Sequence, residues 1–369
     1  MFEVTEYPAL VSLQGMPFVF KVFSDSVEPF LKIMAEPVSG QFELLPVDPI
    51  TNLAIFDLRE YFKTELVNDL NIGSAVVHAN ACKSFTVNFL SYYGNPPQAH
   101  YITGIPLMMM PGKIPRWKQL EFNGAGYESF EGYLVVGNKT HLTWYPDQPK
   151  RVLPDQPEVM YFIARAAATY AITVTINYSD DTSDIYDPGV SVDALLYQIC
   201  SIPVGYNKLG IGAVDPEKTV VSYTVAFAGN TFPRTYLVDH NAYRDTRYII
   251  FRNTLSGYDV LACTGEADES TDTERKIAER VYDVENPNRL NKRVYYSQQT
   301  EIVKLNSGWL QANEKDWLND MMESEEVYEI KGDGLRQPIL IRSTSLDRSV
   351  RNYEPGSVEI EYERLYNTV

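Results

Sequence analysis

The sequence predicts a mainly β protein, made of two or three antiparallel β-sandwich-like domains with a few short helices. Apolar and polar residues alternate over 85–89, 172–178 and 221–227, which is the period of a strand with one buried face. Helical spacing is scarce, and Pro, Gly, Asn or Ser separate the short apolar runs. Many short strands with turn residues between them are typical of sandwiches.

The remaining strands and helices are predicted from shorter sequence patterns. Further strands are expected, in chain order, at 18–23, 30–38, 133–136, 248–251 and 339–341. Residues 56–66 place apolar side chains at helical spacing and predict a short helix at one end of a sandwich. Residues 313–324 predict a second helix, with Asn313 as its N-cap and Trp317 in its apolar stripe. We expect that helix to pack Trp317 on a sheet.

Two changes in composition divide the chain. Pro-Asp-Gln-Pro occurs twice within 145–158, and proline lacks an N–H donor and stiffens the backbone, so we expect a connector or excursion and not a central strand. The stretch 266–293 is rich in charge. It could be a solvated loop, a long edge ribbon, or an arm ordered against a neighbouring subunit, and the sequence leaves all three open. The expected domains are 1–145, 146–265 and 266–369.

The charge balance excludes some partners. The 369 residues include 32 Lys plus Arg and 49 Asp plus Glu, a formal charge of −17 that repels phosphate backbones, so nucleic acid is not an expected partner. The most apolar stretches, 105–110 and 161–178, are too short or are interrupted by Arg165, so no membrane insertion is expected. The N-terminal residues lack the basic and apolar regions of a secretory signal.

No motif for catalysis or cofactor binding is present. The four histidines have no partner at ligand spacing, and a nucleophile elbow, a P-loop and a dinucleotide glycine motif are all missing. We therefore predict a protein that is not an enzyme and uses no cofactor. The densest carboxylate cluster comprises Asp180, Asp181, Asp184 and Asp187. These are weak calcium candidates because the D-x-D-x-D-G register and closing Glu are missing, and a solvated hairpin loop is favoured.

Aromatic residues stand out in the composition, with 26 Tyr, 16 Phe and 4 Trp. Tyrosine combines an apolar body with a polar tip, which suits half-wet sheets and subunit interfaces. Trp117, Trp144 and Tyr145 could also stack on pyranose rings, although packing is the commoner use of such residues. A host-surface glycan is therefore an alternative partner.

The C-terminal strand expected at 357–366 alternates an apolar face with a row of three acids, Glu359, Glu361 and Glu363. Such a row is either a solvated edge that its charge protects from aggregation or a surface that docks on a basic neighbour. The charge-rich arm supplies the candidate cations Arg275, Lys276 and Arg280. In a ring of identical copies, the basic arm of one copy could pair with the acidic strand of the next.

Two stretches carry a resemblance. They are RYIIFRNTLSGYDVLACTG at 247–265 and LNSGWLQANEKDWLNDMMESEEVYEI at 305–330, followed by the terminal strand, with a weaker likeness over 42–56. They resemble virion structural proteins encoded by phages and prophages of Bacteroidetes-type hosts. The resemblance covers about the last third of the chain and rests on pattern, not on a catalytic signature.

This resemblance implies a tail, baseplate or collar component that is assembled in the cytoplasm of the bacterial host. Such a protein works with identical copies in a ring or hub and with other virion proteins. The expected function is therefore that of a non-enzymatic virion structural protein. A receptor- or glycan-binding module of a tail fibre is the alternative, and a glycan hydrolase, which needs two close carboxylates in a cleft, comes third.

Overall fold

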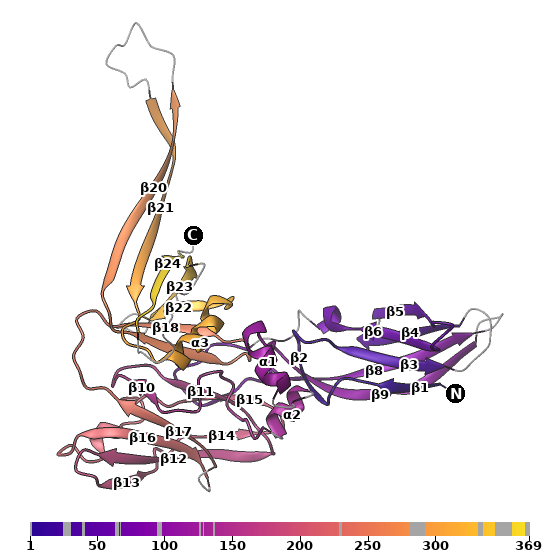
Figure 1. Ribbon diagram of the computed structural model, residues 1–369, viewed down its shortest axis with the longest axis horizontal. Helices are drawn as coiled ribbons and strands as arrows, with labels where there is room; N and C mark the ends of the chain where they lie inside the picture. The colour runs from indigo at the N-terminus through magenta and orange to yellow at the C-terminus, as the bar shows by residue number, and fades with distance from the viewer. Residues whose placement is uncertain are drawn as a thin grey trace. The chain divides into compact units, whose positions relative to one another are not determined.

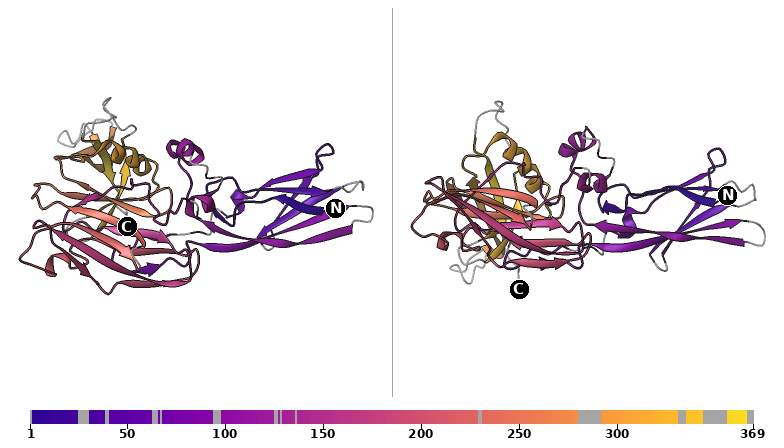
Figure 2. Two further views of the ribbon diagram at one scale, coloured as in Figure 1. Left: turned by 60° about the horizontal axis from the view of Figure 1, so that its bottom comes forward. Right: turned by 90° about the horizontal axis from the view of Figure 1, so that it is seen from below.

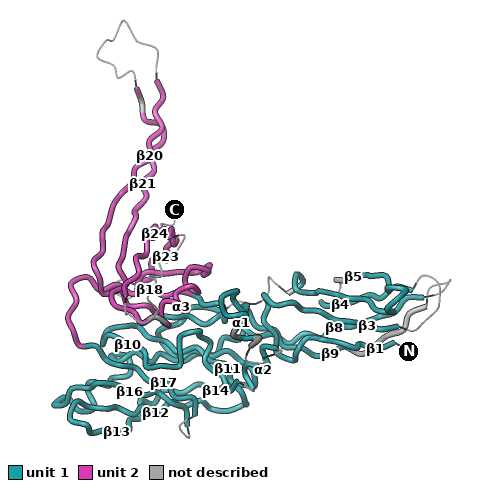
Figure 3. The backbone as a smooth tube through the Cα atoms, viewed as in Figure 1, with its two compact units in different colours: residues 1–239, 252–259 teal, residues 240–251, 260–369 magenta. Residues whose placement is uncertain are grey.

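The computed structural model is mainly β with short helices, as the alternation predicts (Figure 1). It describes residues 2–24, 31–38, 41–62, 66, 68–93, 98–124, 127, 129–135, 137–228, 231–279, 292–330, 335–343 and 356–365. The chain divides into two compact units, residues 1–239 with 252–259 and residues 240–251 with 260–369 (Figure 3). The three domains expected from the sequence stay a prediction.

The first unit begins with a sandwich. One sheet has the order β1 (Phe2–Glu6), β3 (Val19–Ser24), β6 (Leu53–Asp57). The other has the order β2 (Val11–Leu13), β9 (Gln98–Met110), β8 (Lys83–Tyr93), β4 (Lys32–Val38), β5 (Gln41–Pro46). Alternate residues of β8 are buried, which confirms the predicted face, and Phe89 packs its ring 5.2 Å from Phe20 and 5.8 Å from Phe56.

A second core in the same unit joins two further sheets. One has the order β10 (Lys150–Val152), β17 (Thr231–Val238), β16 (Val220–Phe227), β12 (Ala168–Tyr178), β13 (Ser183–Tyr186), and β14 (Ser191–Ala194) also pairs with β12. The other has the order β11 (Val159–Ile163), β15 (Ile199–Pro203), β7 (Val76–Val77). The short 3₁₀ helix η2 (Ile211–Ala213) adds Ile211 to this core. Because β10 is an edge strand, the proline-rich stretch forms no central strand, as predicted.

The remaining sheet has the order β19 (Tyr258–Cys263), β18 (Arg247–Arg252), β22 (Val327–Ile330), β23 (Arg336–Ile341), β24 (Glu359–Arg364), β21 (Lys292–Asn306), β20 (Ala267–Glu279). The helix α3 (Ala312–Met322) lies against it (Figures 1 and 2). Trp317 is 1% exposed, and its ring lies 5.2 Å from that of Phe251 on β18, which confirms the predicted packing. The N-cap is Gln311 and not Asn313, because the Gln311 N–H donates to Glu314 Oε2 at 2.7 Å.

One predicted element was confirmed in part, and another was wrong in type. Within 56–66, where a short helix was expected, residues 56 and 57 belong to β6. The helix that follows is one turn of 3₁₀ helix, η1 (Arg59–Phe62). The strand expected at 133–136 is instead the helix α2 (Phe130–Val135), which follows α1 (Arg116–Gly124). Ser129 caps α2, since its Oγ accepts from the Gly132 N–H at 3.1 Å. A short apolar run does not by itself distinguish a strand from a buried helical turn.

The cysteines are free thiols. Cys200 and Cys263 are buried, and burial raises the pKa of both thiols, while Cys82 is half-buried.

Within the described residues, the helices are all too short or too polar to cross a membrane.

Trp317→Ala is expected to lower the free energy of unfolding by about 3 to 5 kcal/mol, because it deletes a large side chain from a packed site. Trp309 is 73% exposed, so Trp309→Ala is the matched control, with an expected change within about 0.5 kcal/mol. Urea denaturation followed by circular dichroism measures both. Equal stabilities for the two variants would contradict the packing of α3.

Candidate functional site

The four aspartates of the calcium candidate lie in and beside the hairpin that joins β12 to β13. Asp180 accepts from the Thr182 N–H at 3.1 Å and lies 3.4 Å from Lys218 Nζ. Asp184 accepts from the Tyr178 hydroxyl at 3.0 Å, and Asp187 accepts from the Gly189 N–H at 2.8 Å. Throughout the described residues, no three His, Cys, Asp or Glu side chains come together as metal ligands.

The acidic row lies inside its sheet. β24 pairs with β21 on one side and with β23 on the other, so its interpretation as a protected edge strand was wrong. Glu361 lies 3.6 Å from Lys304 Nζ, and Glu363 lies 2.8 Å from Arg342 Nη2. Cations of the same chain therefore already face two of the three acids. The docking of this row on a neighbouring copy stays a prediction.

Ion pairs around the buried carboxylate of Glu329 join strands at the base of this sheet. Arg364 on β24 donates to Glu329 on β22 at 2.9 Å, to Glu269 on β20 at 2.8 Å and to Glu301 on β21 at 3.2 Å. Arg247 on β18 donates to Glu329 and to Glu269, each at 2.8 Å. Burial alone would raise the pKa of Glu329, but the hydrogen bonds and charges of Arg364 and Arg247 outweigh it and lower that pKa. Five strands are thereby joined through two guanidinium groups.

Beyond this base, β20 and β21 continue as a two-stranded ribbon (Figure 1). β24 covers β21 only over residues 302–306, so residues 292–301 pair with β20 alone in the described part of the chain. At about 3.3 Å per residue, this free part is roughly 30 Å long. Every β20 residue after Ala267 is exposed. Of the three alternatives for 266–293, the long edge ribbon is therefore what the structure shows for the residues it describes.

The ribbon carries the arm's candidate cations. Arg275 and Lys276 are exposed on β20, and Lys276 Nζ lies 4.9 Å from the centre of the Tyr296 ring. Arg280 lies outside the described residues. Near these cations, Ile277 is paired with Val294, and both side chains are about half exposed. Apolar and cationic side chains thus share the distal part of the ribbon.

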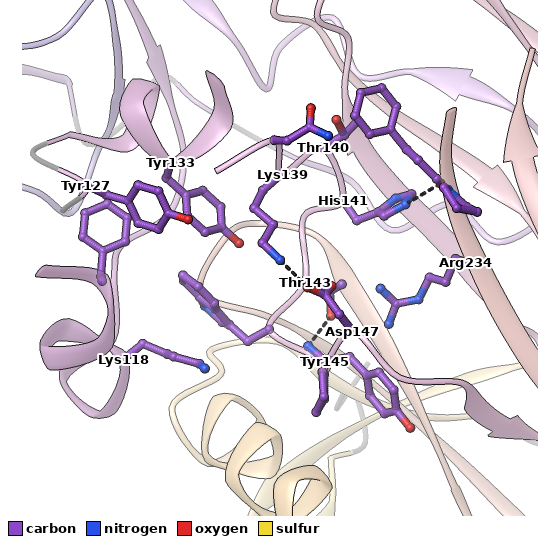
Figure 4. A pocket seen from close by; sticks show the side chains of 16 residues that line it. Lys118, Tyr127, Tyr133, Lys139, Thr140, His141, Thr143, Tyr145, Asp147 and Arg234 are labelled. Carbon is purple, nitrogen blue, oxygen red and sulfur yellow. Dashed lines mark hydrogen bonds and ion pairs between the residues drawn. The ribbon is translucent and has the colours of Figure 1, made fainter. Parts of the chain in front are cut away.

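A pocket of about 470 Å³ in the first unit is a second candidate site (Figure 4). It lies between α1, α2, the segment 138–147 and the start of β17. Its aromatic lining consists of Phe122, Tyr127, Tyr133, Trp144, Tyr145 and Phe232. Trp144 and Tyr145, two of the residues considered for pyranose stacking, are therefore part of one concave site.

The aromatic wall is held together by ring contacts. Tyr133 lies 5.8 Å from Phe122, 5.4 Å from Tyr127 and 5.6 Å from Trp144, measured between ring centres. Gly137 permits this closeness, because a Cβ there would lie 2.7 Å from the Tyr127 hydroxyl and 2.5 Å from the Tyr133 carbonyl oxygen. The Trp144 indole N–H donates to Thr254 Oγ1 at 2.8 Å, which fixes its ring.

Three cations also line the pocket, interspersed with its aromatic rings (Figure 4). Lys139 forms an ion pair with Asp147. Lys118 Nζ lies 5.9 Å from the centre of the Trp144 ring, and the Arg234 guanidinium lies 5.2 Å from the centre of the Tyr145 ring. These three cations come from α1, the 138–147 segment and β17, which explains why no local sequence pattern revealed them.

His141 contributes a neutral imidazole. Burial and then the charge of Arg234 lower its pKa to about 4. Its Nε2 lies 3.0 Å from the Phe232 carbonyl oxygen, which can only accept, so Nε2 carries the proton and Nδ1 is an acceptor. Nδ1 and the hydroxyl of Thr140 are both buried without a hydrogen-bond partner in the structure.

Arg165 contacts two residues of the pocket that have a left-handed backbone conformation. Asn138 and Phe232 both have φ of 51°, a left-handed conformation that is rare for a bulky side chain. Arg165 Nη1 donates to Asn138 Oδ1 at 2.6 Å, and its guanidinium lies 5.5 Å from the centre of the Phe232 ring. One cation therefore contacts two residues that line the pocket.

No protein-family model matches the chain, and no curated protein matches it.

Glu329→Gln and Arg364→Met are each expected to lower the free energy of unfolding by about 3 to 5 kcal/mol at pH 7, because each removes one member of the ion-pair network around the buried Glu329 carboxylate. The pKa of Glu329 is lowered on folding, so its contribution is complete above the unfolded value of about 4.3 and is lost as the pH falls through the folded value. The advantage of the wild type over Glu329→Gln should therefore shrink below about pH 4.3.

Denaturant titrations between pH 7 and pH 3 measure this difference. The exposed Glu325 of the same unit provides the control Glu325→Gln, which should track the wild type at every pH. A gap between wild type and Glu329→Gln that stays constant on acidification would contradict the ion-pair assignment.

Proposed function

We propose that the chain is a non-catalytic structural protein of a phage virion, of the tail, baseplate or collar type, and that it assembles with identical copies and neighbouring virion proteins. The observation that carries this proposal is the ribbon. Over its free length both faces are exposed, and a two-stranded ribbon of this kind is at best marginally stable alone in water. A neighbouring subunit would supply the missing contacts.

The open edges of the ribbon favour a strand-pairing partner. Residues 294–300 of β21 read Val-Tyr-Tyr-Ser-Gln-Gln-Thr, an uncharged segment rich in strand-forming residues. An exposed edge of this composition is a template for pairing with another chain. β20 also has an open edge, since it ends the sheet order, and it carries five acids and two cations over 267–279.

Two different open edges on one ribbon suit a head-to-tail arrangement. Pairing the β20 edge of one copy with the β21 edge of the next is a heterologous contact, and such contacts close into rings when the rotation allows. The resemblance of 247–265 and 305–330 to virion structural proteins supports the same function.

The pocket separately favours recognition of a glycan as a second function. A hydrolase is not favoured, because Asp147 is the one acid among the described lining residues.

The ribbon proposal predicts that Val294→Lys together with Tyr295→Lys dissociates the native assembly without unfolding the chain, because two charges are placed on the pairing edge. Sedimentation velocity should show the wild type at a multiple of 42.0 kDa and the double variant at 42.0 kDa.

The matched control is Ile185→Lys together with Leu196→Lys. It adds the same charge at two exposed apolar positions of the first unit, Ile185 at 80% and Leu196 at 46% exposure, and should assemble like the wild type. A wild type that remains monomeric at about 100 μM, a concentration at which even weak specific contacts are populated, would overturn the proposal.

A further inference from the structure

The two edges of the ribbon differ in charge, and this difference restricts how identical copies can pair. Over 267–279, β20 carries five acids and two cations, so the β20 edges of two copies repel each other. The β21 edge is uncharged over 294–300. Two β21 edges could meet without repulsion, but the β20 edge of both copies would then stay open. A contact between unlike edges avoids the repulsion, and repeated from copy to copy it covers both edges of every ribbon.

The direction of the strands determines the direction of a neighbouring ribbon. Within one ribbon β20 and β21 are antiparallel, with Thr273 opposite Gln299. If the neighbouring ribbon points the same way, its β20 runs antiparallel to the β21 that it joins. If it points the opposite way, the two joined strands are parallel. Antiparallel pairing is slightly more stable per residue, and it continues the ladder already present in the ribbon, so neighbouring ribbons should point in the same direction.

We propose that the ribbons of identical copies pair edge to edge, β21 of one copy with β20 of the next, and close into a shared β-barrel with two strands from each chain. This inference rests on the assembly proposed above and adds the direction of the ribbons and the architecture of the contact. Full closure is the arrangement that removes sheet edges altogether. Ribbons that are marginally stable alone thereby become one sheet of many strands.

A β-bulge marks the distal limit of the regular ladder. The register shifts by one residue between Lys276 and Ile277, so Tyr295 of β21 is an extra residue without a partner on β20. Bulges increase the local twist, are frequent at the rims of barrels and can end regular pairing. Toward the base, β24 covers β21 from Ile302 onward. Among the described residues, the segment of β21 with a free edge and a regular ladder is therefore 296–301, about 20 Å of strand.

The acids of β20 give this barrel a distinctive dependence on salt. The β20 strands of successive copies lie two strand spacings apart, about 9.6 Å. That separation exceeds the screening length of about 8 Å at about 0.15 M salt but is well below the length of about 30 Å at about 0.01 M. Added salt therefore weakens the repulsion between copies and tightens the assembly. Docking of basic side chains on acidic ones would show the opposite dependence.

Cysteine cross-linking of the full-length protein tests the strand order. Thr273→Cys and Gln299→Cys, both at exposed positions, are made as separate variants, mixed at low salt, brought to about 0.15 M salt and oxidised. We expect a disulfide-linked dimer at twice 42.0 kDa in the mixture and not in either variant alone, because equivalent positions of neighbouring copies are too far apart for a disulfide. Ser297→Cys replaces Gln299→Cys in a second mixture, which covers a shift of two residues in register. Ile185→Cys mixed with Leu196→Cys is the matched control and should give no dimer.

Sedimentation velocity at the two salt concentrations tests the charge argument. The Kd of the contact between wild-type copies should be about tenfold lower at about 0.15 M than at about 0.01 M salt. Asp272→Asn should reduce this ratio to about threefold, because it removes an exposed acid of β20. Asp181→Asn is the matched control, since it removes an exposed acid of the first unit, and it should keep the wild-type ratio. Circular dichroism confirms that each variant is folded.

Several outcomes would overturn the barrel. Cross-linking of Thr273→Cys alone would show pairing of two β20 edges, and cross-linking of Gln299→Cys alone would show pairing of two β21 edges. Tighter assembly at low salt would favour docking of basic on acidic side chains. A wild type that assembles while neither mixture cross-links would overturn the barrel and leave the assembly of identical copies standing, whereas a wild type that stays monomeric would overturn both. The two failures are therefore distinguishable.

Discussion

The buried carboxylate of Glu329 is the constraint on which the second unit depends. Glu329 is 3% exposed, so its charge must be matched within the protein, and Arg247 and Arg364 match it from two other strands. Arg364 belongs to the last described strand, so the C-terminus must return to the middle of the sheet before the network is complete. The same guanidinium groups hold Glu269 and Glu301 at the root of the ribbon. The ribbon is therefore anchored at its base, whereas beyond Glu301 β21 pairs with β20 alone among the described residues.

The cations discussed in the two units contact different groups, and this contrast bears on function. In the second unit, carboxylates meet Arg247 and Arg364 at hydrogen-bonding distance, which is the usual arrangement of a structural ion pair. In the pocket of the first unit, Lys139 is paired with Asp147, and Arg234 and Lys118 lie over the aromatic rings of Tyr145 and Trp144. Lys150, outside the pocket lining, shows that this unit can also build a buried ion pair, since it lies 2.6 Å from Glu158. Contacts between cations and aromatic rings are thus a local feature of the pocket.

Much of the fold could be predicted because it depends on local periodicity. The alternation around Phe85 and Ile172 and the stripe that contains Trp317 each reflect burial of one face, and burial of one face leaves a pattern in the sequence. Residues 133–136 were misassigned because four apolar residues fit either element and the decisive hydrogen bond comes from Ser129. The pocket could not be predicted, since Lys118 and Arg234 are more than a hundred residues apart and are brought together by tertiary structure alone. The position of Glu361 inside the sheet likewise depends on strand order, which periodicity does not encode.

The ribbon and the pocket would bind different kinds of partner, and assembly through the ribbon would change the overall affinity that the pockets provide. A strand edge selects another polypeptide through backbone hydrogen bonds, whereas a small concave site with few cations can bind a single sugar only weakly. Weak binding is sufficient when many identical sites act together, because linked sites convert later binding steps into intramolecular ones and raise the overall affinity by about 10² to 10⁴ without any new contact. A ring joined through its ribbons would carry one pocket per chain. Weak binding of one sugar by one pocket would therefore be compatible with firm attachment of an assembly of many chains to a glycan-covered surface.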